Sequence, residues 1–381
     1  MKLLGLLASF ALVACQGKAS ATNVDASTDG GAAMASAPVP SPPAASARPD
    51  LRAPRVVSLS RRVSSMVDVV PGRPADAEHP AGTVYFATVL DNEARRGEAT
   101  LFEWDVASAQ PLHPEGRLLY QESDKEENGK STDVRIAASR DDLYVAVTLE
   151  KGKFTVLGRS SLTRGGASPV GPGLPPARNL SLETDGQWLA VAYERLDYSY
   201  GTAEVPRSGV LLYEAWSMKH VATFPFSQSR EVGVRYDILE ILDGHLYAAE
   251  VTGTKLHIVK LAMPSLQPVK MTDVSVPKGA ERVQLTRMQG HLVALTHDVV
   301  VELTPDLEVV RRRDLHSDEV AVGPGAELLT PLGLERPGHR GDFVPDVRAS
   351  ASCTPSWAGA YPLLACAVDM EGIRIARLAP R

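Results

Sequence analysis

Oxygen ligands at alternate positions mark one short segment of the chain, DKEENGKSTD at residues 124–133. Asp124, Glu126 and Asn128 have the spacing with which calcium-binding loops begin, and carboxylate and amide oxygens are the ligands that a hard cation prefers. Arg135 stands where such a loop places its last, bidentate Glu, so the pattern is incomplete. The segment is therefore either a calcium site or a solvated acidic turn, and calorimetry with calcium distinguishes the two.

Cys15 ends an N-terminal segment, MKLLGLLASFALVAC, that has a basic residue at Lys2 and an apolar run over residues 3–13. This order is typical of an export signal. The run is shorter than the ~20 residues that a membrane-spanning helix needs. The tetrad LVAC at residues 12–15 resembles the lipobox of bacterial lipoproteins, in which signal peptidase cleaves before a lipidated cysteine. The alternative is an ordinary cleaved leader in which Cys15 carries no lipid.

The lipobox resemblance implies where the protein lies in the cell. Residues 1–14 would be the signal peptide, and acyl chains on Cys15 would hold the protein on a membrane surface. Gln16 follows the cysteine instead of Asp, which by resemblance to the common sorting rule implies the outer membrane. The expected location is the bacterial cell envelope, with the membrane as one partner through the lipid anchor.

Cys353 and Cys366 remain after Cys15 is assigned to the lipid, because the chain has three cysteines. An even pair in an oxidising envelope compartment predicts a disulfide. Two buried thiols are the alternative, since the neighbours of Cys366 are apolar. No Cys-x-x-Cys spacing occurs in the sequence, so the cysteines indicate neither a redox motif nor a zinc site.

The charge of the chain argues against one class of partner. The net charge is -6, and a nucleic-acid-binding surface needs a basic excess to neutralise phosphates. The densest basic run, residues 311–313, lies between an apolar stretch and Asp314 and is expected to be a solvated strand end. We therefore expect no nucleic-acid partner.

Two insertions carry candidate recognition residues. Tyr198 and Tyr200 lie in the segment of residues 195–209, and amphipathic aromatic residues on a loop suit contact with a protein or a glycan. A long hairpin whose tyrosines pack locally is the simpler interpretation. Arg340 belongs to an Arg-Gly-Asp tripeptide in residues 331–346, a triplet that also arises by chance.

No catalytic motif is found in the sequence. Nucleophile elbows, phosphate-binding loops and the H-E-x-x-H pattern are all absent, and the nine histidines are spread singly. The sequence implies no cofactor. If the protein were an enzyme, we would expect its acidic residues to come from the ends of first strands, for which the candidates are Asp133, Asp237, Glu240 and Asp346.

The elements that must position these residues are strands. Residues 15–52 are rich in Ala, Ser and Pro and predict a flexible tether after the lipid. Residues 53–381 contain six copies of a unit in which a polar turn precedes a strand that is apolar on both faces, as in TDGQWLAVA. No amphipathic helical pattern accompanies them. The prediction is an all-β domain whose sheets are covered on both sides.

Units of this kind resemble the blades of β-propellers of the WD40 and YVTN types. The resemblance implies six blades, or seven if the irregular segment of residues 319–347 holds a diverged one. The last copy lacks a fourth strand, and residues 54–60 are expected to pair with it and close the ring. The Gly-His and Trp-Asp signatures of WD40 blades are not present in register.

Two functions are consistent with these features. The first is an envelope lipoprotein whose propeller is not an enzyme and binds a protein or glycan partner through its loops. The alternative is a propeller hydrolase or lactonase with a metal in the central channel. A metal held by buried carboxylates in the channel would favour the second.

Overall fold

The computed structural model describes an all-β chain. The described residues are 55–59, 68–92, 95–120, 131–149, 155–161, 167–169, 174, 177–195, 206–226, 236–277, 283–288, 290–296, 299–314, 320–322, 327–330, 333–336, 339–340, 353–358, 361–368 and 372–377. Thirty strands and no helix are assigned within these ranges. This confirms the all-β class expected from the alternating and doubly apolar strand patterns.

The strands form small sheets that follow one another along the chain. The first sheet contains β2 (Asp68–Pro71), β3 (Thr83–Asn92), β4 (Arg95–Asp105), β5 (Gln110–Pro111) and β6 (Arg117–Tyr120). The second contains β7 (Ser131–Ala138), β8 (Asp142–Leu149), β9 (Thr155–Ser161) and β10 (Ala167–Pro169). The third contains β11 (Ala177–Thr184), β12 (Trp188–Arg195), β13 (Ser208–Glu214) and β14 (Lys219–Pro225).

The next two sheets are connected by a short strand that precedes one in sequence and pairs with the other. The fourth sheet contains β16 (Leu239–Leu242), β17 (His245–Thr252), β18 (Lys255–Ala262) and β19 (Gln267–Ser275). The fifth contains β20 (Val283–Met288), β21 (His291–Leu295), β22 (Val299–Leu303) and β23 (Val309–Asp314). The short β15 (Tyr236–Asp237) precedes the fourth sheet in sequence but pairs in parallel with β20 of the fifth.

The sixth sheet lies in the irregular segment. It contains β24 (Val320–Val322), β25 (Glu327–Thr330), β26 (Gly333–Arg336) and β27 (His339–Arg340). The described strands therefore form seven sheets rather than six. The sequence allowed for a seventh unit in residues 319–347, and this sheet lies in that segment. The count of six copies left it out because its strands are only two to four residues long and show little alternation.

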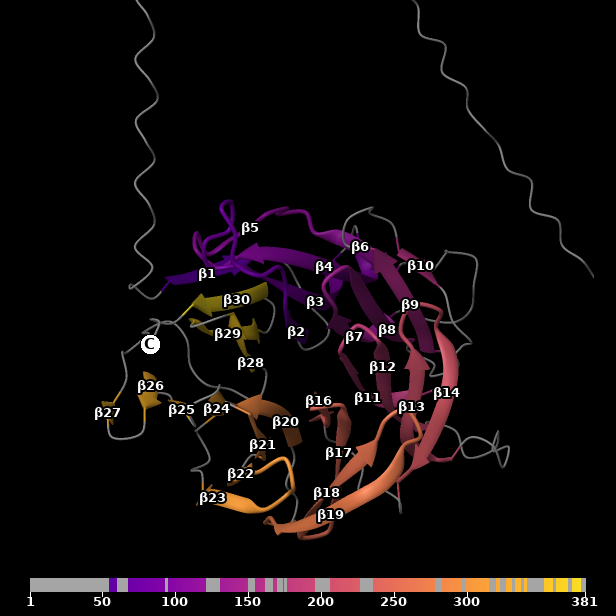
Figure 1. Ribbon diagram of the computed structural model, residues 1–381. Coiled ribbons are helices and arrows are strands. Elements are labelled where there is room, and N and C mark those ends of the chain that lie inside the picture. The colour runs from indigo at the N-terminus through magenta and orange to yellow at the C-terminus, as the bar shows by residue number, and fades with distance from the viewer. Residues whose placement is uncertain are drawn as a thin grey trace, which may run out of the picture. The chain divides into compact units, whose positions relative to one another are not determined.

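The seventh sheet joins the two ends of the domain. It contains β28 (Cys353–Ala358), β29 (Tyr361–Val368) and β30 (Gly372–Arg377), and its fourth strand is β1 (Arg55–Leu59). β1 pairs antiparallel with β30, with Arg55 opposite Arg377 and Leu59 opposite Ile373. Figure 1 shows the indigo β1 beside the yellow β30. The expected pairing of the N-terminal strand with the last unit is confirmed.

Neighbouring sheets pack face to face. Apolar clusters join the seventh sheet to the first, the first to the second, the second to the third, and the third to the fourth and fifth. In the first sheet, Phe86 and Trp104 face the seventh sheet while Tyr85 and Leu101 face the second. Both sets of alternating side chains are buried, so the doubly apolar strands of the sequence are explained.

The hairpins between third and fourth strands share an unusual backbone. Ala109, Met218, Leu266 and Leu307 have φ between 53° and 58°, although none is glycine. A left-handed conformation costs a non-glycine residue about 1 kcal/mol or more. All four side chains are buried, and burial of a Leu or Met side chain contributes about 1.5–3 kcal/mol. Core packing therefore overrides the local backbone preference and makes four equivalent hairpins.

Candidate functional site

Most residues singled out from the sequence lie outside the described residues. These are Cys15, Asp124, Glu126, Asn128, Tyr198, Tyr200 and Asp346. Arg340 is the last residue of β27 and Asp237 the last of β15, and only their backbones are described. Asp133 and Glu240 are described fully, and both lie on the first strand of their sheets.

A buried ion pair connects the first strands of the first two sheets. Asp68 on β2 accepts a hydrogen bond at 2.7 Å from the backbone N–H of Ile136 on β7. The other carboxylate oxygen of Asp68 lies 3.6 Å from the guanidinium of Arg135, which is also 3.5 Å from Asp133. Asp68 and Arg135 are both buried. Asp133 therefore neutralises a structural arginine, in a contact that holds two sheets together.

Glu240 occupies the corresponding contact between the fourth and fifth sheets. Its carboxylate lies 3.7 Å from the guanidinium of Arg287 on β20. Burial raises the pKa of Glu240 to about 7, although the charge and the backbone N–H of Arg287 act in the opposite direction. A buried carboxyl group with a pKa near neutrality is the kind of group that serves as a general acid or base.

We expect Glu240 to make the protein less stable as the pH rises. The carboxyl group binds its proton more tightly in the folded state, so its favourable contribution is complete below pH ~4.5 and is lost as the pH passes 7. Glu240→Gln should raise the free energy of unfolding by about 2 kcal/mol at pH 8 and change it little at pH 4.5. Urea unfolding of both proteins at the two pH values measures this.

The matched control is Glu308→Gln, because Glu308 is exposed and lies 3.9 Å from Lys270. Its effect should stay within about 0.5 kcal/mol at either pH. An equal effect of Glu240→Gln at pH 4.5 and pH 8 would show that Glu240 does not titrate between these values.

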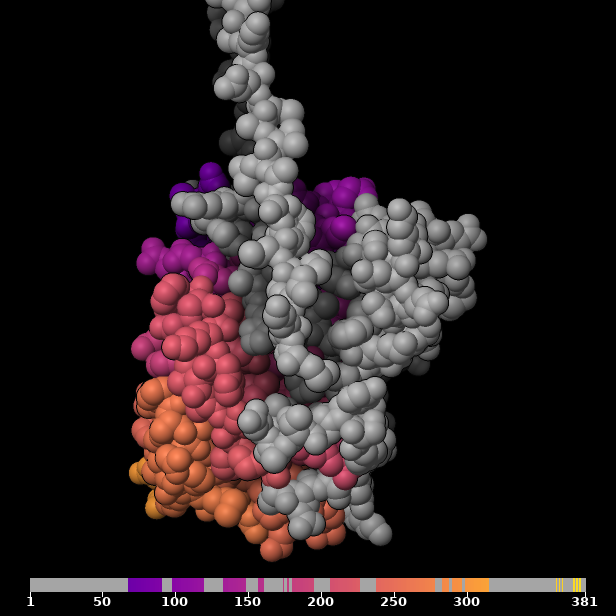
Figure 2. Space-filling view, turned by 90° about the vertical axis from the view of Figure 1, so that its right-hand side faces the viewer, coloured from indigo at the N-terminus to yellow at the C-terminus, as the bar shows by residue number. Residues whose placement is uncertain are grey.

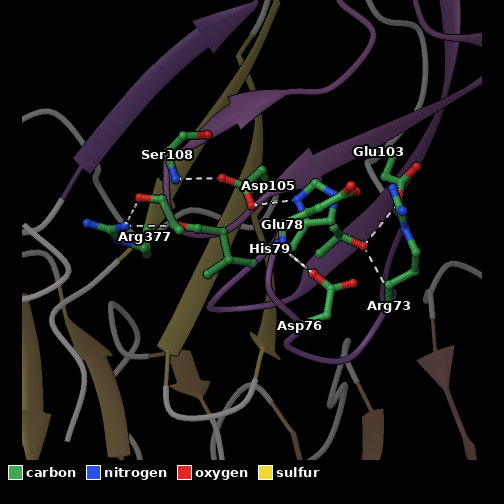
Figure 3. A network of polar contacts seen from close by, with 11 residues as sticks. Arg73, Asp76, Glu78, His79, Glu103, Asp105, Ser108 and Arg377 are labelled. Atoms are coloured by element: carbon green, nitrogen blue, oxygen red, sulfur yellow. Dashed lines mark hydrogen bonds and ion pairs between the residues drawn. The ribbon is translucent and has the colours of Figure 1, made fainter. Parts of the chain in front are cut away.

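A polar network lies where the first sheet meets the seventh (Figure 3). Nδ1 of His79 is 3.1 Å from the carboxylate of Asp105 at the end of β4. The second oxygen of Asp105 accepts a hydrogen bond from the backbone of Ser108. Asp76 accepts hydrogen bonds from the backbone N–H groups of Glu78 and His79. These contacts fix the β4–β5 hairpin and the loop that precedes β3.

Arg377 of β30 completes this network from the seventh sheet. Its guanidinium donates hydrogen bonds to the carbonyl oxygens of Val106 at 2.9 Å and Ala107 at 2.5 Å, within the β4–β5 hairpin. Its side chain also lies over the ring of Tyr361, 5.7 Å from the ring centre. A His–Asp pair alone could suggest catalysis. Here the pair belongs to contacts that hold the β4–β5 hairpin, and Arg377 links that hairpin to the seventh sheet.

An exposed apolar surface lies elsewhere, on three consecutive sheets. Six of the seven large hydrophobic side chains that are exposed in the described part of the chain belong to the third, fourth and fifth sheets. We call them the apolar rim, because all lie on fourth strands or on the turns that lead into them. They are Trp216, Val221, Val269, Met271, Val309 and Val310.

Trp216 is the most exposed member of the apolar rim, with 66% of its surface accessible. It lies two residues before the left-handed residue of its hairpin, and the equivalent positions in three other hairpins hold Ala107, Pro264 and Pro305. The hairpin conformation therefore does not need a tryptophan. Its backbone carbonyl accepts a hydrogen bond from Arg159 of the second sheet, which anchors this turn.

Three valines of the apolar rim share one structural position. Val221, Val269 and Val310 each lie three residues after the left-handed residue, where the pairing with the third strand shifts by one residue. Such a β-bulge leaves its extra residue unpaired and twists the edge of the sheet. Bulges protect edges against strand addition. The rim is therefore suited to contact through side chains rather than through backbone pairing.

The fourth strands of these sheets are also basic. β14, β19 and β23 together contain five Lys or Arg residues and two Asp residues, whereas the whole chain has a net charge of -6. Lys270 lies 3.9 Å from Glu308, and Arg312 lies 3.3 Å from Asp314. Arg311 lies 3.2 Å from Glu302. β23 contains three of the five basic residues, and its Arg311 and Arg312 are exposed although each has an acidic neighbour.

Figure 2 views the molecule from the side on which β14 lies in Figure 1. The pink surface of the third sheet and the orange surface of the fourth adjoin there. Sequence reasoning missed this surface. The repeated valine three residues after each hairpin residue was a readable signal, but a valine pattern by itself does not distinguish an exposed position from a core position.

Within the described ranges, no group of three or more His, Cys, Asp or Glu residues is arranged to hold a metal ion. Nor does that part of the chain contain a helix with the length and apolar character needed to cross a membrane. Comparison with protein-family models and with curated proteins found no match to this chain.

Proposed function

We propose that this protein is an outer-membrane lipoprotein of the bacterial envelope, anchored through Cys15, whose domain is a seven-bladed β-propeller that binds a partner protein through the apolar rim. The observation that carries the binding function is that, among the described residues, six of the seven exposed large hydrophobic side chains lie on three consecutive sheets. Exposed large apolar side chains that concentrate on one part of a protein favour an interaction surface there.

The propeller arrangement is supported by contacts between first strands. β2 contacts β7, β7 contacts β11, β11 contacts β16, and β16 contacts β20. β24 contacts β28, and β28 contacts β2 again. Figure 1 shows the sheets following one another around the domain. Completion of the last sheet by the N-terminal strand is the usual way in which such a ring removes its open edges.

A partner protein with an acidic surface fits the apolar rim best. Trp and Arg are the residue types that most often dominate binding energy at protein interfaces. Trp216 and Met271 supply large apolar surfaces. Arg311 and Arg312 supply exposed guanidinium groups, which would exchange their contacts with Glu302 and Asp314 for contacts with the partner. The partner predicted for this surface therefore has an apolar pocket flanked by Asp or Glu.

The binding function is tested by placing a photo-crosslinking residue at Met271 of the full lipidated chain in cells. The matched control position is Leu118, which is also an exposed apolar residue on a fourth-strand position, but in the first sheet. We expect one product that forms from Met271 and not from Leu118. Trp216→Ala should weaken binding of the isolated partner about tenfold or more.

Two further measurements test the same interface. Arg312→Glu should lower the yield of the product if the partner is acidic, while the thermal stability of both variants stays unchanged because the substituted side chains are exposed. Equal crosslinking from Met271 and Leu118, or a yield that Trp216→Ala does not change, would refute a specific interface on the apolar rim.

The anchor is tested separately. Cys15→Ala should abolish lipidation and release the protein from membranes, because Cys15 is the lipid attachment site that we propose. A Cys15→Ala protein that is processed normally and remains with membranes would refute the anchor without affecting the rim.

A metal-dependent propeller hydrolase is the second candidate. The buried Glu240, with its pKa of about 7, is the observation that favours it. Metal analysis of the purified protein and a substrate screen of wild type and Glu240→Gln distinguish the two functions. Stoichiometric metal together with a hydrolytic activity lost in Glu240→Gln would support the enzyme.

A further inference from the structure

The backbone places two cysteines directly opposite each other in the seventh sheet. Cys353, the first residue of β28, pairs with Cys366 of β29 in an antiparallel register. Opposite residues of antiparallel strands have Cα atoms ~4.5–5.5 Å apart and lie on the same face of the pair. A disulfide needs a Cα separation of ~4.4–6.8 Å. The register therefore satisfies this requirement without any movement of the backbone.

A proline shows which type of pair the cysteines form. Pro355 lies opposite Leu364 in the same two strands, and it has no N–H to donate. Since β28 is at the end of its sheet, Pro355 fits only where the missing N–H would point away from β29. Pair types alternate along the strands, so Cys353 and Cys366, two positions away, also form a non-hydrogen-bonded pair. Such pairs have the shorter Cα separation, ~4.5 Å.

We infer that Cys353 and Cys366 form a cross-strand disulfide that links β28 to β29. The inference rests on the export that we propose, because an oxidising compartment is where such a bond forms and persists. β29 pairs with β30, and β30 pairs with β1. The disulfide thus reinforces the sheet in which the first and last strands of the domain meet.

Formation of the bond requires a disulfide-bearing protein of the envelope as the oxidant. The thiolate of one cysteine attacks the disulfide of the oxidant, which forms a mixed disulfide and releases one thiolate of the oxidant. The second cysteine, after losing its proton, attacks the mixed disulfide and releases the other thiolate. Two electrons pass to the oxidant, which becomes a dithiol after taking up two protons.

The test is thiol alkylation of the mature protein, purified from cells, under denaturing conditions. Without reductant, Cys353 and Cys366 should resist alkylation, and digestion should give a single peptide pair joined through sulfur. After reduction, both residues should be alkylated. Cys353→Ser and Cys366→Ser should each leave one thiol that reacts without reductant. Alkylation of both residues in the unreduced wild-type protein would contradict the bond.

A second arm separates this inference from the proposed export. The chain of residues 16–381, made in a reducing cytoplasm, is exposed to a glutathione redox buffer. We expect quantitative oxidation and a Tm about 5 °C or more above that of the reduced protein, with no such shift in the double serine variant. If export fails but oxidation succeeds here, only the localisation is wrong. If the folded chain does not oxidise, the disulfide is refuted.

Discussion

Replacement of Arg377 by Ala is expected to lower the free energy of unfolding by about 4 kcal/mol. The side chain is 1% exposed and donates to the carbonyl oxygens of Val106 and Ala107. Loss of the guanidinium leaves two buried acceptors without this donor, at about 1–3 kcal/mol each, and opens a cavity beside Tyr361. The two partners are 271 and 270 residues away in sequence, so this contact joins the ends of the domain.

Urea unfolding of Arg377→Ala and Arg377→Met measures this loss. Met refills most of the volume without donating a hydrogen bond, so its effect should be smaller by the cavity contribution of about 1–2 kcal/mol. Arg312→Met is the matched control, because Arg312 is exposed and pairs across the surface with Asp314. The control should change stability by less than about 0.5 kcal/mol. Equal effects at the two arginines would mean that Arg377 does not hold the sheets together.

The second large effect is expected at Asp68. Asp68→Ala removes the acceptor for the Ile136 N–H and the carboxylate that lies 3.6 Å from the buried guanidinium of Arg135. Breaking a buried ion pair from one side typically costs about 3–5 kcal/mol, because the remaining charge is left in a poorly solvated site. We expect a loss of about 3 kcal/mol, since Asp133 still neutralises part of the charge of Arg135.

A double-mutant cycle separates the ion pair from the hydrogen bond. Asp68→Asn keeps an oxygen for the Ile136 N–H but removes the charge, and Arg135→Met removes the cation while keeping most of the volume. If the pair acts as a unit, the double variant should be more stable than the sum of the two single losses predicts, by about 1–2 kcal/mol. Strict additivity would show that the 3.6 Å contact between Asp68 and Arg135 contributes no interaction energy.

Strand type and sheet burial were readable from the sequence because both depend on local patterns. In the segment DLYVAVTL, the side chains on both faces of the strand are mostly apolar. This pattern is sufficient to predict β8 and its burial between two sheets. The pairing of residues 55–59 with the last unit was also predictable, because that unit lacked a fourth strand. The sixth sheet escaped a firm prediction because its strands are too short to show a period.

The buried ion pairs, the hydrogen bonds between sheets and the exposed apolar rim could not be predicted, because they depend on contacts between residues that are distant in sequence. Arg377 and Val106 are 271 residues apart, and Asp68 and Ile136 are 68 residues apart, so no spacing rule indicates that they meet. The pKa of Glu240 is raised by burial, which is a property of the packed sheets and not of the residue. In the same way, valines at three β-bulges are exposed although valine is usually a core residue.

The sequence by itself determined the all-β class and the doubly apolar strands, since the hydrophobic period specifies these features. It also indicated the pairing of residues 55–59 with the last unit, because that unit lacks a fourth strand of its own. Only the tertiary structure decided which charged residues form contacts that link two sheets, and which apolar residues remain at the surface. Burial and desolvation act between segments that are distant in sequence, and the energy of a charged or apolar side chain is set by those neighbours.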